Sequence, residues 1–170
     1  ESLRTPFVMR YPGHIKPGTQ LQEMIVNIDF APTILNIAGI QTPSDMQGKS
    51  FLPLVTKTTP AAKKSFAATW RKSMYYHYYE YPQPHHVAPH FGVRTTRYKL
   101  IRFYGPHNNW ELFDLQKDPT EMNNLINDPS YASIITELKK ELKDLMVHYQ
   151  DLDALTIWNT TESTMQDMPK

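Results

Sequence analysis

The chain has 170 residues, with 18 Lys and Arg against 17 Asp and Glu, and it contains no cysteine. This length suffices for one domain with a sizeable core, or for a small domain and a piece of another. The charges are spread without long runs of one sign, which argues against a nucleic-acid surface built from clustered cations. The lack of cysteine excludes disulfides and thiolate metal sites, and no apolar run approaches the roughly 18 residues of a membrane span.

The N-terminal part of the sequence predicts a strand followed by a helix. The apolar stretch 6–11 (PFVMRY) is closed by a Pro-Gly turn and is typical of a short strand. Within 28–38 apolar residues recur at helical spacing, with Asn27 or Asp29 as a cap and Gly39 as the stop. The chain begins without Met and without the basic and apolar regions of a signal peptide, so we expect a fragment of a longer protein.

Beyond a polar linker at 56–64, the sequence predicts strands and then a long helix. The expected strands are 65–70, a segment of the tyrosine-rich run, 91–104 with a break near Thr96, and 110–115. Asp128 and Pro129 open the clearest helix, which has one apolar stripe to bury. The stripe consists of Ile134, Ile135, Leu138, Leu142, Leu145, Met146 and Tyr149. Residues 151–170 are polar and predict an irregular tail.

Together these elements predict an α+β fold, in which a small antiparallel sheet is packed by a long C-terminal helix and preceded by a strand-helix piece of a larger α/β domain. The expected parts are 1–55 for that piece, 56–64 for the linker, 65–150 for the C-terminal α+β subdomain and 151–170 for the tail. Without the rest of the α/β domain, we expect an exposed apolar edge on 6–11 and on the helix 28–38.

The segment 75–95 (YYHYYEYPQPHHVAPHFGVRT) holds five of the ten tyrosines and four of the seven histidines. A metal site is one interpretation, because His86 and His90 are four residues apart, the spacing that places two imidazoles on one helix face. Pro89 directly precedes His90, and two further prolines precede the pair, so a regular helix is not expected here. Without the helix, the spacing loses its meaning as a metal signature.

Nucleic-acid binding is a second interpretation of the same segment, since aromatic rings interleaved with cations can stack on bases and neutralise phosphates. The fixed cations around the segment are Arg71, Lys72, Arg94 and Arg97, and Glu80 opposes them. These are too few for a basic stripe, so we expect no nucleic-acid partner.

Sugar recognition is a third interpretation. Aromatic faces suit the C–H surface of a pyranose, and an imidazole can donate to or accept from hydroxyl groups and attract an anion when protonated. The alternative is structural, because tyrosines can cover a sheet or a domain interface while their hydroxyls reach water. For His90, at the expected start of a strand, both roles stay open.

Five blocks in fixed order carry a family resemblance: RTPFVMRYPGHIKPGT, VNIDFAPTILNIAGIQTP, MQGKSFLPLV, RYKLI and WELFDLQKDPTEMNNL. From Glu1 to about Tyr149 the chain resembles the C-terminal third of the formylglycine-dependent sulfatases of the alkaline phosphatase superfamily. It is most similar to bacterial N-acetylglucosamine 6-O-sulfatases that act on glycosaminoglycan or mucin sugars. The resemblance implies sulfuric ester hydrolysis by the full-length protein.

In this family the nucleophile is a formylglycine made from the Cys or Ser of a C-x-P-x-R or S-x-P-x-R motif, supported by a calcium ion. The chain contains neither motif, so we expect both groups in a preceding N-terminal part and no catalytic or metal-binding residue here. The dispersed carboxylates agree with this, since Asp29 is expected to cap a helix and most others to be solvated. This fragment alone is therefore not expected to be catalytically competent.

The resemblance also implies substrate contacts and partners. In the family a loop of the C-terminal subdomain contacts the sugar, which makes His90 the first substrate-binding residue expected here, followed by His86, His85 and Glu80. The expected partners are the protein's own N-terminal catalytic domain and a sulfated carbohydrate, and the expected location is periplasmic or secreted. The alternative is a non-catalytic module, derived from the same scaffold, that binds a glycan or a protein.

Overall fold

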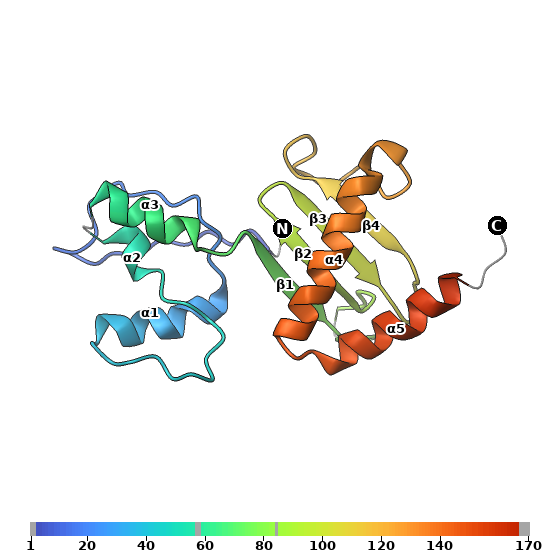
Figure 1. The fold of residues 1–170 in the computed structure, drawn as a ribbon, viewed down its shortest axis with the longest axis horizontal. Coiled ribbons are helices and arrows are strands. Elements are labelled where there is room, and N and C mark those ends of the chain that lie inside the picture. The colour runs from blue at the N-terminus through green and yellow to red at the C-terminus, as the bar shows by residue number, and fades with distance from the viewer. Residues whose placement is uncertain (1–2, 57–58, 84, 167–170) are drawn as a thin grey trace. The chain divides into compact units, whose positions relative to one another are not determined.

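The structure, a computed structural model, describes residues 3–56, 59–83 and 85–166, with side chains up to residue 160. The chain divides into two compact units, Glu1–Arg71 and Lys72–Lys170. Unit 1 contains the short helices and unit 2 contains the sheet with its helices (Figure 1). The division falls after the expected linker 56–64, whose residues 60–64 belong to the helix Pro60–Ala68.

Unit 1 is built from four short helical elements. They are η1 (Asn27–Asp29), α1 (Phe30–Ile37), α2 (Leu52–Val55) and α3 (Pro60–Ala68). Together η1 and α1 confirm the helix predicted at 28–38. Gly39 follows it with a φ of 70°, a left-handed conformation that favours glycine and ends the helix as expected.

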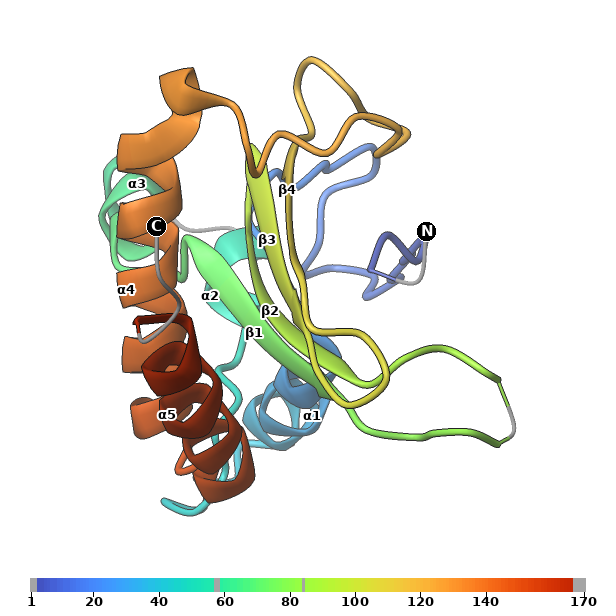
Figure 2. The same cartoon turned by 90° about the vertical axis from the view of Figure 1, so that its right-hand side faces the viewer.

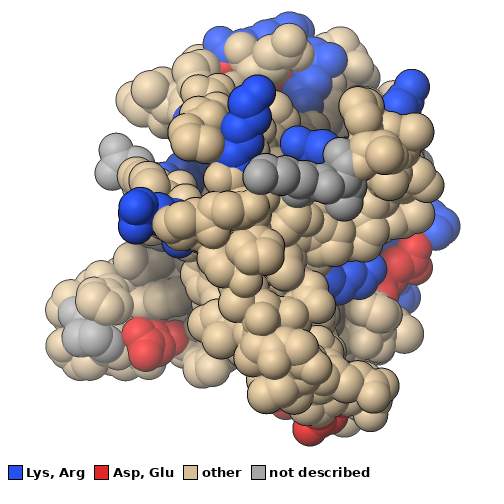
Figure 3. Space-filling model, turned by 90° about the vertical axis from the view of Figure 1, so that its left-hand side faces the viewer, with Lys and Arg blue, Asp and Glu red and all other residues tan. Residues whose placement is uncertain are grey.

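The core of unit 1 is small and leaves an apolar surface uncovered. Phe51, Leu54 and Trp70 are buried together. The exposed large apolar side chains of the described part of unit 1 are Phe7, Val8, Ile28, Phe30, Ile34, Ile40 and Met46. Val8 is 91% exposed, and uncharged side chains cover wide areas of the face drawn in Figure 3. The apolar edge expected on 6–11 and on the 28–38 helix is therefore present.

Two strand predictions in unit 1 are wrong. Residues 6–11 form no strand, because among the described residues no neighbouring strand offers the hydrogen bonds that an extended segment needs. Residues 65–70, expected as a strand, instead belong mostly to α3. Thr59 caps this helix by accepting from the Ala62 N–H at 3.3 Å, with Pro60 at its first position, and its alanines favour the helical state.

Unit 2 contains the antiparallel sheet that the sequence predicts. Its strands are β1 (Ser73–Tyr78), β2 (His90–Thr95), β3 (Tyr98–Phe103) and β4 (Trp110–Asp114), in the spatial order β1-β2-β3-β4. The register places Tyr75, Val93, Leu100 and Leu112 across from one another in one row. Side chains alternate between the faces, so this row belongs to a single face of the sheet.

Helices cover that face. The 3-10 turn η2 (Pro129–Tyr131) leads into α4 (Ala132–His148), and α5 (Leu152–Gln166) follows. Figure 2 shows α4 and α5 on the same side of the sheet. Leu138, Leu142 and Met146 of α4 pack in the core with the sheet, which confirms the predicted stripe.

The irregular tail predicted at 151–170 is wrong over most of its length. Residues 152–166 form α5, and Ala154 and Trp158 are buried in the core of unit 2. The Trp158 ring meets Trp110 of β4 edge-on, with 5.4 Å between the ring centroids. Packing against the sheet therefore stabilises a helix that its own sequence, rich in Thr, favours only weakly.

Candidate functional site

Two of the three connections between consecutive strands of the sheet lie at one end of unit 2. Residues 79–89 join β1 to β2, and residues 104–109 join β3 to β4. Both loops leave the sheet at the same end (Figure 2). They are tied together by the Tyr104 N–H, which donates to the Pro89 carbonyl at 3.1 Å. The segment that the sequence singles out, 75–95, thus belongs to a defined surface at this end.

His90 is fixed at the first residue of β2. Its Nδ1 lies 2.8 Å from the Ala88 carbonyl oxygen. A carbonyl can only accept, so Nδ1 donates and Nε2 of the neutral imidazole is an acceptor. The ring contacts those of Tyr76, Tyr78 and Phe103, at centroid distances of 5.6, 5.3 and 4.9 Å. Over the described ranges, no hydrogen bond reaches Nε2.

The surroundings of His90 favour its neutral form. Burial is the main cause that lowers the pKa of His90, and the electrostatic effects of Lys99 and His77 act in the same direction. The hydrogen bond to Ala88 opposes this effect without outweighing it. A neutral imidazole with an open Nε2 suits a hydroxyl donor better than an anion.

We expect the ring of His90 to titrate below the usual value of about 6.5 for histidine. Because the folded pKa is the lower one, the unfolded chain binds the extra proton. The contribution of His90 to stability is therefore full above about pH 6.5 and decreases as the pH falls below it. An NMR titration of the histidine ring resonances, with His90→Gln for assignment, measures the midpoint, and a value above that of exposed His107 contradicts the expectation.

The other expected substrate-binding residues, His86, His85 and Glu80, are exposed on the 79–89 loop. His86 has a φ of 53° and its Nε2 lies 3.5 Å from Nε2 of Gln83. Within the part of the chain that the structure describes, no hydrogen bond, ion pair or ring contact joins these three residues to His90. The structure thus places all four at one end of the sheet but does not bring them together.

Sequence reasoning missed a hydrogen-bonded group centred on His77 of β1. His77 Nδ1 lies 2.8 Å from Asp151 Oδ2, and its Nε2 lies 2.7 Å from the Tyr104 hydroxyl. The Tyr75 hydroxyl donates to the same Asp151 oxygen at 2.7 Å. Tyr75 and His77 are two residues apart on a strand and so share a face, a signal that the sequence contains. Asp151 could not be found in the same way, because residues 151–170 were expected to form an irregular tail.

Charges and burial set the protonation of this group. Burial of Asp151 works against its ionisation, but hydrogen bonds from the Ala154 N–H, Tyr75 and His77 outweigh it and lower the pKa of the carboxyl. The ionised carboxylate can only accept, so Nδ1 of His77 donates to it and Nε2 of the neutral ring accepts from Tyr104. Burial, together with the charges of Asp151 and Asp153, raises the pKa of Tyr104 to about 12.

A groove of about 750 Å³ opens beside this group and lies wholly within unit 2. We call it the tyrosine groove and define it by six of its lining residues, His77, Tyr79, Tyr81, Tyr104, Asp151 and Asp153. Tyr79 is 73% exposed and Tyr81 is 48% exposed, whereas Tyr75 packs against the core. The expectation that the tyrosines mainly pack therefore holds for Tyr75 but not for these two.

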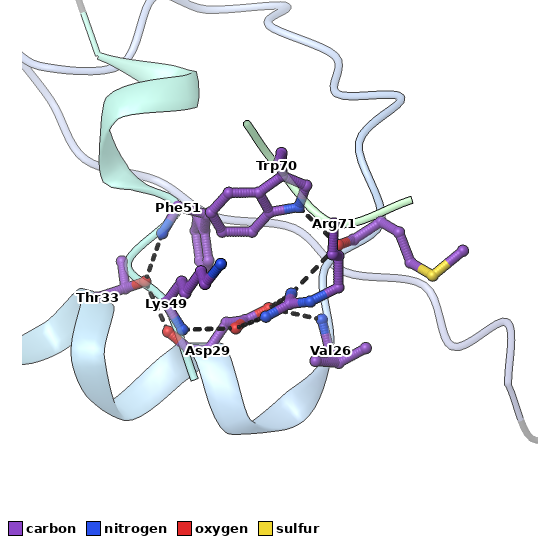
Figure 4. Close-up of polar contacts among 8 residues, drawn as sticks. Val26, Asp29, Thr33, Lys49, Phe51, Trp70 and Arg71 are labelled. Carbon is purple, nitrogen blue, oxygen red and sulfur yellow. Dashed lines mark hydrogen bonds and ion pairs between the residues drawn. The ribbon is translucent and has the colours of Figure 1, made fainter. Parts of the chain in front are cut away.

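Asp29 of unit 1 lies in a second polar group, drawn in Figure 4. It is fully buried, and its carboxylate accepts from the backbone N–H groups of Val26 and Lys49, both at 2.9 Å. Both guanidinium nitrogens Nη1 and Nη2 of Arg71 donate to the two carboxylate oxygens. The carboxylate thus caps the start of η1 through the Val26 N–H, makes no cap to α1, and also links η1 to the segments of Lys49 and Arg71.

Neighbouring side chains extend this group. The Thr33 hydroxyl donates to the Asp29 carbonyl at 2.7 Å and accepts from the Phe51 N–H at 3.1 Å. The Trp70 indole N–H donates to the Met24 carbonyl at 2.8 Å (Figure 4). Every oxygen of the Asp29 carboxylate is thereby engaged by the protein itself, which makes the group a structural junction of unit 1.

The residues that the structure describes contain no group of three His, Asp or Glu side chains able to hold a metal ion. They do not fit the calcium ion that the sulfatase resemblance implies, because no three such ligands converge among them. Among the same residues, no helix has the length and apolar character needed to cross a bilayer.

The fold of unit 2, a four-stranded antiparallel sheet with helices on one face, defines the class of the protein as an α+β unit of sulfatase type. The family model described as N-sulphoglucosamine sulphohydrolase, C-terminal, matches residues 1–148. The chain therefore belongs to this family of sulfatase C-terminal parts.

Curated relatives share this assignment. The chain is 43% identical over 155 residues to an N-acetylglucosamine-6-O-sulfatase of Bacteroides thetaiotaomicron, covering 90% of the chain and 26% of the relative. It is 33% identical over 156 residues to human arylsulfatase K, covering 90% of the chain and 27% of that protein. The chain thus spans about a quarter of the length of these relatives.

Solved structures share the fold. One, of a protein in complex with its substrate D-glucosamine-2-N,6-O-disulfate, matches with a TM-score of 0.76 and 44% identity, covering 84% of the chain and 28% of that protein. A phosphonate monoester hydrolase from Silicibacter pomeroyi matches with a TM-score of 0.64 at 23% identity, covering 82% of the chain and 28% of that protein. The second match shows a common fold only.

Proposed function

We propose that the whole protein is a carbohydrate sulfatase that hydrolyses a sulfate ester on an amino sugar or glycosaminoglycan. In this proposal the 170 residues form its C-terminal part. The observation that carries it is the match of residues 1–148 to the sulfatase C-terminal family. The 43% identity to an N-acetylglucosamine-6-O-sulfatase supports an N-acetylglucosamine 6-sulfate as the substrate.

In this proposal the formylglycine and the calcium ion belong to a preceding N-terminal catalytic domain. That domain is the partner of the apolar face of unit 1, and the full-length protein is periplasmic or secreted. The coding sequence upstream of Glu1 provides the test. A C-x-P-x-R or S-x-P-x-R motif within a few hundred residues supports the sulfatase, and its absence refutes hydrolysis by a formylglycine.

We propose His90 as the substrate-binding residue, with Nε2 accepting a hydrogen bond from a sugar hydroxyl. Two observations support this role: the hydrogen bond that fixes Nδ1 to the Ala88 carbonyl at 2.8 Å, and the lowered pKa that keeps the ring neutral. His86, His85 and Glu80 then provide contacts from the exposed loop, where their side chains are free to adjust to the ligand.

We expect His90→Ala in the full-length enzyme to lower kcat/KM about tenfold or more on a sulfated sugar, since an interaction with a sugar hydroxyl is lost. On a small aryl sulfate, which lacks that hydroxyl, the activity should stay within about twofold. Steady-state kinetics on both substrates measures the difference. His107→Ala, an exposed histidine of the 104–109 loop, is the control, and equal losses on both substrates would indicate a folding role for His90.

A further inference from the structure

We propose that the tyrosine groove is a second carbohydrate site, which binds an uncharged pyranose residue of the glycan. The inference rests on the proposed function in taking the ligand to be a carbohydrate, but it requires no catalysis by this chain. The size of the groove, its exposed rings, its acceptor groups and its rigid floor carry the proposal.

The groove has the dimensions and lining of a small-molecule site. Its volume of about 750 Å³ lies within the usual range of roughly 300–1,000 Å³ for ligand pockets. Four of its eleven lining residues, His77, Tyr79, Tyr81 and Tyr104, carry aromatic rings, and carboxyl and hydroxyl groups lie among them. This mixture suits a pyranose, which presents C–H groups on its faces and hydroxyls around its edge.

Two tyrosine rings of the groove are exposed rather than used for packing. Tyr79 and Tyr81 lie in the 79–89 loop and are 73% and 48% exposed. The ring of Tyr79 meets that of His77 edge-on at a centroid distance of 5.4 Å. This contact helps to fix the orientation of the Tyr79 ring. Covering such rings with the apolar face of a sugar removes their surface from water, which is favourable.

The fixed polar groups of the groove are acceptors. The Tyr104 hydroxyl donates to His77 and the Thr156 hydroxyl donates to the Leu152 carbonyl at 2.8 Å, so their protons are already used. Asp151 and Asp153 are carboxylates, and no Lys or Arg lies among the lining residues that the structure describes. Sugar hydroxyls can donate to these acceptors, whereas a sulfate or carboxylate group would meet like charge without a fixed donor.

The floor of the groove is rigid before any ligand arrives. His77 bridges Asp151 and Tyr104 with contacts of 2.8 and 2.7 Å, and Asp151 also accepts from the Ala154 N–H at 2.9 Å at the start of α5. Groups that are already held in place lose little conformational entropy on binding. The polar groups of the groove are thus preorganised for a ligand, whereas the exposed side chains of Tyr79 and Tyr81 still lose conformational freedom when a ligand binds.

Isothermal titration calorimetry of the 170-residue chain tests the proposal with two probes. These are an unsulfated N-acetylglucosamine trisaccharide and the 6-O-sulfated N-acetylglucosamine monosaccharide, with unsulfated N-acetylglucosamine as its size-matched reference. We expect the trisaccharide to bind and Tyr79→Ala or Tyr81→Ala to weaken it at least about fivefold, since each removes one stacking ring. We expect the sulfated monosaccharide to bind more weakly than its reference, and Asp153→Asn to reduce that difference.

Gln83→Ala, at an exposed position of the same loop, is the matched control and should leave binding unchanged. Circular dichroism confirms that each variant keeps its fold, which we expect because the substituted side chains are exposed. The proposal is overturned if the trisaccharide does not bind, if the sulfated sugar binds more tightly than its reference, or if Tyr79→Ala behaves like Gln83→Ala. None of these outcomes changes the result expected for the upstream motif or for the His90→Ala kinetics. A failure of the proposed carbohydrate site in the groove is therefore distinguishable from a failure of the proposed sulfatase function.

Discussion

Replacing Asp29 with Asn is expected to lower the free energy of unfolding of unit 1 by about 3–5 kcal/mol, the usual cost of breaking a buried ion pair from one side. The side chain of Asp29 is fully buried and that of Arg71 is 11% exposed. The amide keeps the shape of the carboxylate but removes its charge, and its NH₂ group faces donors instead of accepting from them. The guanidinium of Arg71 is then left without its carboxylate.

Urea unfolding followed through the amide NMR signals of α1 measures this loss in unit 1. Asp45→Asn, at an exposed loop position, is the matched control and should change stability by less than about 0.5 kcal/mol, as is usual for surface substitutions. A double variant that combines Asp29→Asn with Arg71→Met should lose less than the sum of the two single variants, because the uncompensated charge is also removed. A loss from Asp29→Asn no larger than the control's would contradict a structural role for the pair.

Replacing Asp151 with Ala is expected to destabilise unit 2 by about 2–4 kcal/mol, the combined size of a lost helix cap and of hydrogen bonds to a charged group. The carboxylate accepts from the N–H of Ala154 and from Tyr75 and His77 of β1. Its removal leaves these donors unpaired beside the core, where Tyr75 packs. The N-terminus of α5 then loses its polar connection to the sheet.

Thermal unfolding of unit 2 measures the effect, with Asp153→Ala two residues further along as the control. Asp153 shares the first turn of α5 but is exposed, so its replacement should cost much less. The lowered pKa of Asp151 adds a dependence on pH. Its stabilisation is full above the unfolded value of about 3.9 and is lost as the pH falls through the lower folded value, so the difference between wild type and Asp151→Ala should shrink at low pH.

Much of unit 2 could be predicted from the sequence, because local patterns and tertiary packing agree there. The break at Thr96 separates β2 from β3 as expected. Asp128 accepts from the Ser130 N–H at 2.9 Å and precedes the helical segment that the capping signal predicted. Leu138 and Leu142, both in the predicted stripe, are buried.

Other elements could not be predicted, because distant residues determine them. The sequence of α5 has a weak helical pattern and contains several Thr and Ser residues, which favour helices little; Trp158 holds it by packing on Trp110, which lies 48 residues earlier. In the same way, the local sequence predicts only a helix cap for Asp29. Its ion pair with Arg71 could not be predicted, because the two residues lie 42 positions apart in the sequence.

The sequence indicates a region for the candidate site rather than its individual residues. The density of rings and imidazoles in 75–95 indicated the end of the sheet, but spacing could not tell which of them would be fixed. His90 is held by a backbone carbonyl and three rings, whereas His85 and His86 extend into solvent. His77 was overlooked because its two partners, Tyr104 and Asp151, lie 27 and 74 residues away.

The bonds of Asp151 also have a consequence for how unit 2 reaches its native state. They connect β1 to the start of α5 across 76 and 74 residues, so the first strand of the unit, which pairs with β2 along its length, gains these side-chain contacts from nearly its last element. Contacts between residues so far apart in the sequence slow folding, because closing the long intervening loop costs conformational entropy before the contacts can form and offset it. On the ribosome, β1 must therefore wait for α5 to emerge before it gains this anchor.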